Sequence, residues 1–148
     1  MWSRNLLPLK ILYSPLLRLR FRSAVASCVD QINTASYCCI LLAPIEAPRT
    51  LAVDIEHLKH QPPTGTIYVK DSEARKATRG NIEVFKVGKD NLSSAIIRLP
   101  ESEDSPFNTT AIALQELCHL LGIRENDEIE QQSLTLDDVA LLLKLYNR

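Results

Sequence analysis

The sequence predicts one α+β domain in which a mixed β-sheet packs against helices, and three observations lead to this prediction. The chain has 148 residues, 45% of them apolar, so one domain of this length can bury roughly 68–70% of its unfolded surface. Its apolar runs follow the order strand, long helix, several strands, helix, helix. Most strand-like runs fall in the first two thirds of the chain. Residues 1–148 are therefore predicted to form a single domain.

The first strand and the first helix differ in the spacing of their apolar residues. Residues 8–13 alternate between apolar and polar or helix-breaking residues, which predicts a half-buried strand. Ser14 and Pro15 then provide a turn that can open a helix. From residue 15 to about residue 33 the apolar residues recur three or four positions apart. This spacing predicts a long amphipathic helix.

Five later runs predict strands. The run SYCCILLAP at 36–44 is short, rich in β-forming residues and closed by a proline, which predicts a central strand. In TLAVDIEHL at 50–58, apolar and acidic residues alternate in part, which predicts another strand. The polar stretch 71–79 fits a loop or a short helix equally well. The remaining predicted strands are 66–70, 82–87 and 94–100.

Two helices are predicted in the last third of the chain. The first begins near Asn108 and ends at Gly122, because glycine is the usual residue for a left-handed helix stop. The second begins at Thr135, which forms a capping box with Asp138 three residues later. Asp137 and Asp138 are interpreted as charges favoured at a helix start, not as catalytic acids.

The charge balance argues against nucleic acid or an anionic membrane as a partner, because the formal net charge is only −1. The distribution is uneven, since five basic residues and no acid precede Asp30. We expect this segment to be the folded first strand and helix; the alternative is an organelle transit peptide. No apolar run is long enough to cross a bilayer. The chain is predicted to be cytoplasmic, with organelle targeting through residues 1–29 as the alternative.

The cysteines and two of the histidines are predicted to have no role in chemistry. The cysteines lack the spacing of a zinc site, so we expect all four to be small buried hydrophobic residues. His57 and His60 are predicted to lie on the surface, because residues three apart in a strand face opposite sides. The four cysteines are Cys28, Cys38, Cys39 and Cys118.

Residues 110–125, TAIALQELCHLLGIRE, follow the frame of a zinc-peptidase helix. Two histidines four residues apart face the same side of a helix, because 400° of rotation leaves them roughly 40° apart. A glutamate next to the first histidine takes a proton from the zinc-bound water. In the long form H-E-x-x-H-x-x-G-x-x-H, the glycine lets the chain turn back with a third ligand. The chain has Gln115, Glu116, His119, Gly122 and Glu125 at these positions.

With this motif, the chain resembles the metzincin clan of zinc peptidases, and most closely its matrixin-like domains. Trp2 with LPLKI resembles the opening strand of the family, VDI at 53–55 its Ala-Asp-Ile strand, and LTLDDVALLLKLY its closing helix. The resemblance implies a zincin-like fold: a twisted mixed sheet against a long N-terminal helix, an active-site helix and a C-terminal helix. It also implies that Glu116 is the general base, Gly122 the hinge, and that Gln115, His119 and Glu125 occupy the metal positions.

Three departures from the family pattern predict that zinc is bound weakly or not at all. Gln115 offers an amide oxygen, which suits hard ions better than zinc. Glu125 replaces the third histidine, although a carboxylate can bind zinc. The family's methionine-containing turn is missing, because the only methionine is Met1. Changes in residues around a metal typically cost about 10–100-fold in affinity, and replacing an imidazole ligand should cost at least as much.

The predicted function is that of a catalytically impaired or inactive homologue, a pseudopeptidase that binds extended peptides at a sheet edge without a cofactor. One alternative is an active zinc endopeptidase with Gln115, His119 and Glu125 as ligands and Glu116 as base. A second is an unrelated soluble α/β domain in which the motif match is accidental. In that case His119 is a hydrogen-bonded helix residue, Glu116 a solvated side chain and Gln115 a capping or packing group.

Overall fold

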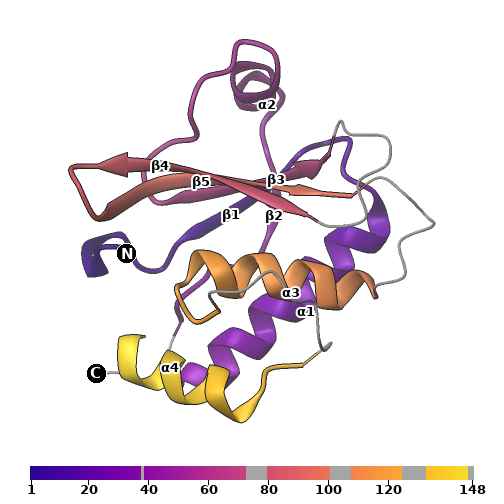
Figure 1. Cartoon of the computed structure of the whole chain (residues 1–148). Coiled ribbons are helices and arrows are strands. Elements are labelled where there is room, and N and C mark those ends of the chain that lie inside the picture. The colour runs from indigo at the N-terminus through magenta and orange to yellow at the C-terminus, as the bar shows by residue number, and fades with distance from the viewer. Residues whose placement is uncertain (38, 73–79, 101–107, 125–132, 147–148) are drawn as a thin grey trace.

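A five-stranded sheet separates two groups of helices in the computed structural model of the chain (Figure 1). Helices α1 (Leu19–Ser36), α3 (Thr109–Leu120) and α4 (Leu136–Tyr146) lie on one face, and α2 (Arg49–Glu56) lies on the other. The predicted α+β domain with a mixed sheet is confirmed. The structure describes residues 1–37, 39–72, 80–100, 108–124 and 133–146.

The sheet has the strand order β2-β1-β3-β5-β4, and only β4 runs antiparallel to its neighbour. Helices α1 and α2 form the crossovers between parallel strands, which cannot be joined by a tight turn. Strands β4 and β5 form a hairpin that turns at Gly88, where φ is +74°. The strands are β1 (Lys10–Tyr13), β2 (Ile45–Glu46), β3 (Thr66–Asp71), β4 (Asn81–Val87) and β5 (Asn91–Leu99). The strands predicted at 8–13, 66–70, 82–87 and 94–100 are confirmed.

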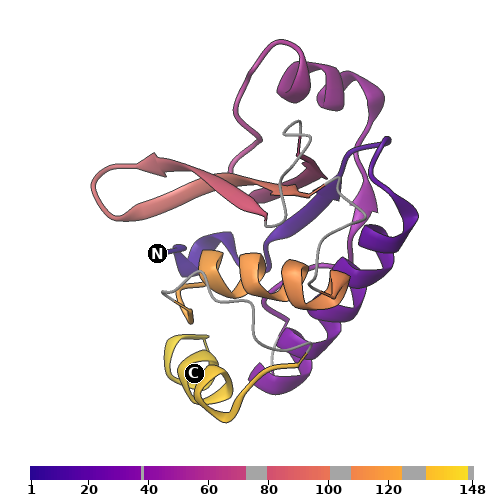
Figure 2. The same ribbon diagram turned by 45° about the vertical axis from the view of Figure 1, so that its right-hand side comes forward.

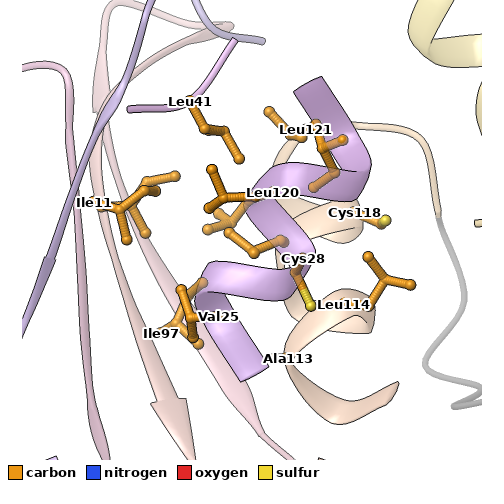
Figure 3. Close-up of a cluster of buried hydrophobic side chains, with 14 of the residues drawn as sticks. Ile11, Val25, Cys28, Leu41, Ile97, Ala113, Leu114, Cys118, Leu120 and Leu121 are labelled. Carbon is orange, nitrogen blue, oxygen red and sulfur yellow. The ribbon is translucent and has the colours of Figure 1, made fainter. Parts of the chain in front are cut away.

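The main core lies between the sheet and helices α1 and α3 (Figure 3). Ile11 and Ile97 project from the sheet towards Cys28 of α1 and Leu114 of α3. Each fully buried residue of this kind contributes about 1.5–3 kcal/mol by removing apolar surface from water. A smaller cluster packs under α2 on the opposite face: Leu12, Ala47, Ala52, Ile55, Tyr68 and Ile96.

The N-terminal segment is part of this core, as the folded prediction requires. It contains a short 3₁₀ helix (Arg4–Leu6), β1 and α1. Trp2 is 3% exposed, and its indole Nε1 donates to the carbonyl of Leu120 at 3.0 Å. The helix starts at Leu19, later than the predicted residue 15, because Ser14 and the residues after it form a turn in which Ser14 Oγ accepts from the Leu16 N–H. None of the helices in the described ranges has the length and apolar character needed to cross a bilayer.

The prediction of a strand at 50–58 is wrong, because this segment forms helix α2. Ala52 and Ile55, three residues apart, are buried, whereas Val53 is 42% exposed. Burial therefore follows the helical period, and the strand-like alternation has no structural role. The VDI segment at 53–55, expected as a strand by the family resemblance, lies within this helix.

The predicted central strand at 36–44 is also wrong. The segment runs along β1 with one parallel bridge, between Leu9 and Leu41, and β2 follows it at the edge of the sheet. The Asn33 side chain forms hydrogen bonds with the backbone of this segment that a neighbouring strand would otherwise form. Its Oδ1 accepts from the N–H groups of Ile40 and Leu41 at 2.9 and 3.1 Å, and its Nδ2 donates to the Leu41 carbonyl at 2.8 Å. Cys39 is exposed, which contradicts the prediction that it is buried.

Candidate functional site

Helix α3 carries the zinc-peptidase frame, and both of its ends are fixed as predicted. The Asn108 Oδ1 accepts from the N–H groups of Thr110 and Ala111 at 2.8 and 3.4 Å, which satisfies free donors of the first turn. After Leu120 the chain turns at Gly122, where φ is +81°, and the Ile123 N–H donates to the Cys118 carbonyl at 3.0 Å. The predicted helix and its glycine stop are confirmed.

Gln115, at the first metal position, is 1% exposed and hydrogen-bonded to an arginine. Its Oε1 accepts from Arg124 Nη1 at 3.1 Å. The same guanidinium donates from Nη2 to Asp138 Oδ2 at 2.6 Å and from Nε to Asp138 Oδ1 at 3.1 Å. Arg124 thus bridges α3 and α4 through one planar group that fits the carboxylate with two donors.

Asp138 completes this network and holds the start of α4. Its Oδ2 accepts from the Thr135 N–H at 2.8 Å, while its own N–H donates to Thr135 Oγ1 at 3.1 Å. The predicted capping box is confirmed. Burial alone would favour the neutral acid, but the hydrogen bonds from Arg124 and Thr135 outweigh it and lower the pKa of Asp138. The carboxylate is therefore a structural group, as predicted.

This arrangement is unfavourable for a metal ion at Gln115. The acceptor oxygen of the amide is bonded to a positive guanidinium, which repels a second cation at short range. Moving Arg124 away would leave the buried carboxylate of Asp138, which is 4% exposed, without its strongest partner. The amide oxygen of Gln115 therefore lies where it accepts a hydrogen bond from Arg124.

Glu116 is buried and not solvated, which corrects the second alternative for this residue. It is 7% exposed and lies against the start of β4. A Cβ atom built on Gly80 would lie 2.9 Å from Glu116 Cγ and 2.9 Å from the Arg98 carbonyl oxygen. Gly80 therefore provides the room in which the Glu116 side chain lies against the sheet.

His119 faces different surroundings from Gln115, although the two lie on one side of α3. The histidine lines a cavity of about 350 Å³, whereas Gln115 bonds to Arg124. Among the described residues around that cavity, His119 is the only histidine, and no cysteine, aspartate or glutamate accompanies it. The others are Met1, Leu92, Leu120, Leu121, Gly122 and Leu145.

The predicted third ligand, Glu125, lies outside the described residues. Within the described ranges, no group of three or more His, Cys, Asp or Glu side chains is arranged to hold a metal ion. The acidic residues that follow Glu125 and the turn expected to carry methionine also lie almost wholly outside the described part.

The cysteines near α3 are unsuited to supply a thiolate ligand. Cys28 and Cys118 are both fully buried, as predicted. Burial raises the pKa of each thiol to about 12, although Arg124 opposes the shift. A metal binds the thiolate, and burial disfavours that charged form in both residues. Cys38 lies outside the described residues.

Arg124 was not identified from the sequence. Nothing in the zinc-peptidase frame assigns a role to the second residue after the glycine. One signal was available: an arginine between a glycine stop and a capping-box aspartate is in position to pair with that acid. His57 and His60 are exposed, as predicted, although the segment before them is a helix.

The resemblance to matrixin-like metallopeptidases depends on the residues of this chain alone. Three of its motif residues, Gln115, Glu116 and His119, lie on α3, and Gly122 follows that helix. Its closing segment forms α4, and its VDI segment lies in α2. Compared with protein-family models and with curated protein sequences, the chain matches none of them.

Proposed function

We propose that this chain is a matrixin-like domain that does not use zinc for catalysis and binds extended peptides along strand β4. The observation that carries the first part is the hydrogen bond between Gln115 and Arg124 at the first metal position. The observation that supports the second part is that β4 is an edge strand, paired with β5 alone among the described strands.

The order of elements supports the scaffold in this proposal. A mixed sheet packs against a long helix near the N-terminus, a helix with the zinc-peptidase frame and a closing helix. These are the parts that the family resemblance implies. The helical VDI segment is the departure, so the scaffold is proposed from the order of elements and from α3, not from that motif.

The network around Arg124 supports the loss of zinc chemistry. In an active site of this type, the residue at position 115 would donate an electron pair to zinc. Here the available oxygen accepts a hydrogen bond from a cation that is itself held by Asp138. Without a bound metal, Glu116 has no activated water from which to take a proton.

The edge of β4 supports peptide binding. Strand β4 has seven residues and pairs only with β5 among the described strands. The strand carries exposed apolar residues, including Val84 at 37% and Val87 at 63% exposure. The opposite edge strand, β2, has two residues and offers little room for pairing. A long, partly apolar edge is a template for an added strand.

Metal analysis of protein purified without chelator tests the loss of zinc. We expect far less zinc than one equivalent per chain. Stoichiometric zinc, together with peptide cleavage that is abolished in Glu116→Ala, would establish the active endopeptidase instead. Restoring both ligands with Gln115→His and Glu125→His should raise zinc affinity, more so when Arg124→Ala is added. If the motif match is accidental, none of these variants will bind zinc more tightly.

Selection from a phage-displayed library of linear peptides tests the β4 edge. Selected peptides should shift backbone amide signals of β4 in NMR spectra. Val84→Lys should weaken binding, because a lysine on an edge strand disfavours pairing. Val53→Lys on α2 is the matched control, since Val53 is 42% exposed and lies outside the sheet. Equal loss of binding in both variants, or shifts confined to other elements, would contradict the assignment.

A further inference from the structure

A small basic cavity lies between the C-terminal end of α2 and strands β3, β4 and β5. Helix α2 lies on one face of the sheet, and α3 and α4 lie on the other (Figure 2). The lining residues place the cavity on the α2 face. Four of its lining side chains are basic: Lys59, His60, Lys70 and Arg98. None of them belongs to the zinc-peptidase frame.

We propose that this cavity binds one tetrahedral oxyanion, either free phosphate or the phosphoryl group of a phosphorylated small molecule. The proposal is independent of the peptide-binding function and of the metal site. It depends on the convergence of charge, on a buried lysine and on the size of the cavity.

Lys70 places a positive charge at the base of the cavity. It belongs to the central strand β3 and is only 6% exposed. Its Nζ lies 3.8 Å from Glu56 Oε1, while Glu56 Oε2 accepts hydrogen bonds from Ser14 Oγ and Tyr68 OH at 2.9 and 2.5 Å. The Glu56 carboxylate is thus shared among three groups, and Lys70, which pairs with it, brings its ammonium group to the lining of the cavity.

Arg98 and Lys59 bring charge from two other elements. Arg98 of β5 points along the same face as Lys70, and Lys59 follows α2 with a left-handed backbone, φ +58°. A left-handed residue just after a helix is a common way for the helix to end, and here it places Lys59 at the cavity. The His60 N–H donates to the Asp54 carbonyl at 2.9 Å, which fixes the backbone beside Lys59.

One acidic side chain competes for Arg98. Glu83 of β4 also lines the cavity, and its Oε1 lies 2.9 Å from Arg98 Nη2. Both side chains of this pair are partly exposed, at 29% and 47%, and an ion pair of this kind is weak in water. An oxyanion that also reaches Lys70 and Lys59 can therefore displace Glu83.

The size of the cavity decides the class of ligand. Its volume is about 80 Å³, whereas one water needs roughly 10–15 Å³ by this kind of measure. Sites for drug-sized molecules have about 300–1,000 Å³. The cavity therefore has room for a group of a few heavy atoms, such as a phosphate, and not for a nucleotide base or a peptide.

NMR titration with inorganic phosphate, at constant ionic strength set with chloride, tests the site. We expect saturable shifts at Lys59, Lys70 and Arg98 that chloride alone does not cause. Arg98→Gln and Lys59→Gln should each weaken phosphate binding about tenfold, because each removes a charge-assisted hydrogen bond. Glu83→Gln should tighten it. Lys144→Gln, an equal change of charge at an exposed position of α4, should leave phosphate binding unchanged.

The affinities of O-phosphoserine and of inorganic phosphate, with serine as the ligand that lacks the phosphoryl group, separate the two sources of the anion. Tighter binding of O-phosphoserine than of phosphate would identify a covalently attached phosphoryl group as the ligand, and the reverse order would identify free phosphate. Thermal unfolding of each variant checks that the fold is intact, and Lys59→Gln alters only an exposed side chain. No saturable shifts, or equal affinities in Arg98→Gln, Glu83→Gln and Lys144→Gln, would overturn the proposal.

Discussion

Arg124 joins two helices through one side chain: Nη1 donates to Gln115 of α3, and Nε and Nη2 donate to Asp138 of α4. Arg124→Met should destabilise the protein by about 3–5 kcal/mol, because it leaves the buried Asp138 carboxylate without its charged partner. Arg124→Lys should recover only part of this loss, since an ammonium cannot pair with two oxygens in the same plane. Urea unfolding measures both effects. A loss below about 1 kcal/mol for Arg124→Met, the value of a surface pair, would contradict this role.

The lowered pKa of Asp138 predicts a pH dependence of stability. A carboxyl group with a pKa lower in the folded than in the unfolded chain contributes stability above its unfolded value of about 3.9. That contribution is lost as the pH falls through the folded-state pKa. The free energy of unfolding should therefore fall below about pH 4.

Asp138→Asn should remove this part of the acid sensitivity and lower stability at pH 7. Asp137→Asn is the control, because Asp137 is exposed in the same helical turn. Unfolding curves between about pH 2 and pH 7 measure the slope. An unchanged slope in Asp138→Asn would contradict the assignment.

Thiol reactivity should separate Cys39 from the two buried cysteines. With pKa values of about 12, Cys28 and Cys118 remain protonated at pH 8 and lie out of solvent. Cys39 is exposed and should react with iodoacetamide first. Peptide mapping by mass spectrometry measures the order of labelling. Labelling of Cys118 at the rate of Cys39 in folded protein would mean that α3 opens frequently.

At the scale of single residues, the sequence predicted which side chains lie on α3 but not what they contact. The spacing of Gln115 and His119 is a local property of a helix, so it follows from the sequence. The bond to Arg124 depends on how the chain returns after Gly122. The exposure of Cys39 did not follow from the sequence for the same reason, because it depends on how the chain between α1 and β2 lies against the rest of the fold.

Among the elements, two glycines next to α3 act in different ways. A Cβ at Gly122 would meet nothing within 4 Å, so Gly122→Ala should cost only the left-handed backbone penalty, about 1–2 kcal/mol. A Cβ at Gly80 would lie 2.9 Å from Glu116 Cγ and from the Arg98 carbonyl oxygen. Gly80→Ala should therefore move Glu116 and shift the NMR signals of β4 and β5, while Gly122→Ala should leave them unchanged. The reverse pattern would contradict the packing of Glu116.

Helices with clear end signals were predicted correctly. The error at α2 fell on a segment whose apolar residues fit both the spacing of a helix and the spacing of a strand. Asn108, Gly122 and Thr135 mark the ends of α3 and the start of α4 through local hydrogen bonds. In α2 the same residues fit both a strand and a helix, and the choice depends on packing against the sheet. Segment 36–44 has the composition of a central strand. However, β3 lies on the side of β1 that faces the centre of the sheet, so only the edge side of β1 is left for this segment.

For the whole molecule, composition and element order predicted the α+β class, whereas the strand order did not follow from them. Among the helices of the described ranges, α2 lies on one face, and α1, α3 and α4 lie on the other. The basic cavity and the network around Arg124 consequently lie on opposite sides of the sheet. Each should respond to its own substitutions without affecting the other, because distant sites with no shared partners have nearly additive effects.

The burial of Trp2 has a practical consequence. It is the only tryptophan in the chain, and its indole ring bonds to the end of α3. Its fluorescence therefore comes from one place, the junction between the N-terminal segment and the helix in question. Red-shifted emission on substitution or on titration with zinc would report that α3 has moved away from the ring, and no extrinsic dye is needed to see it.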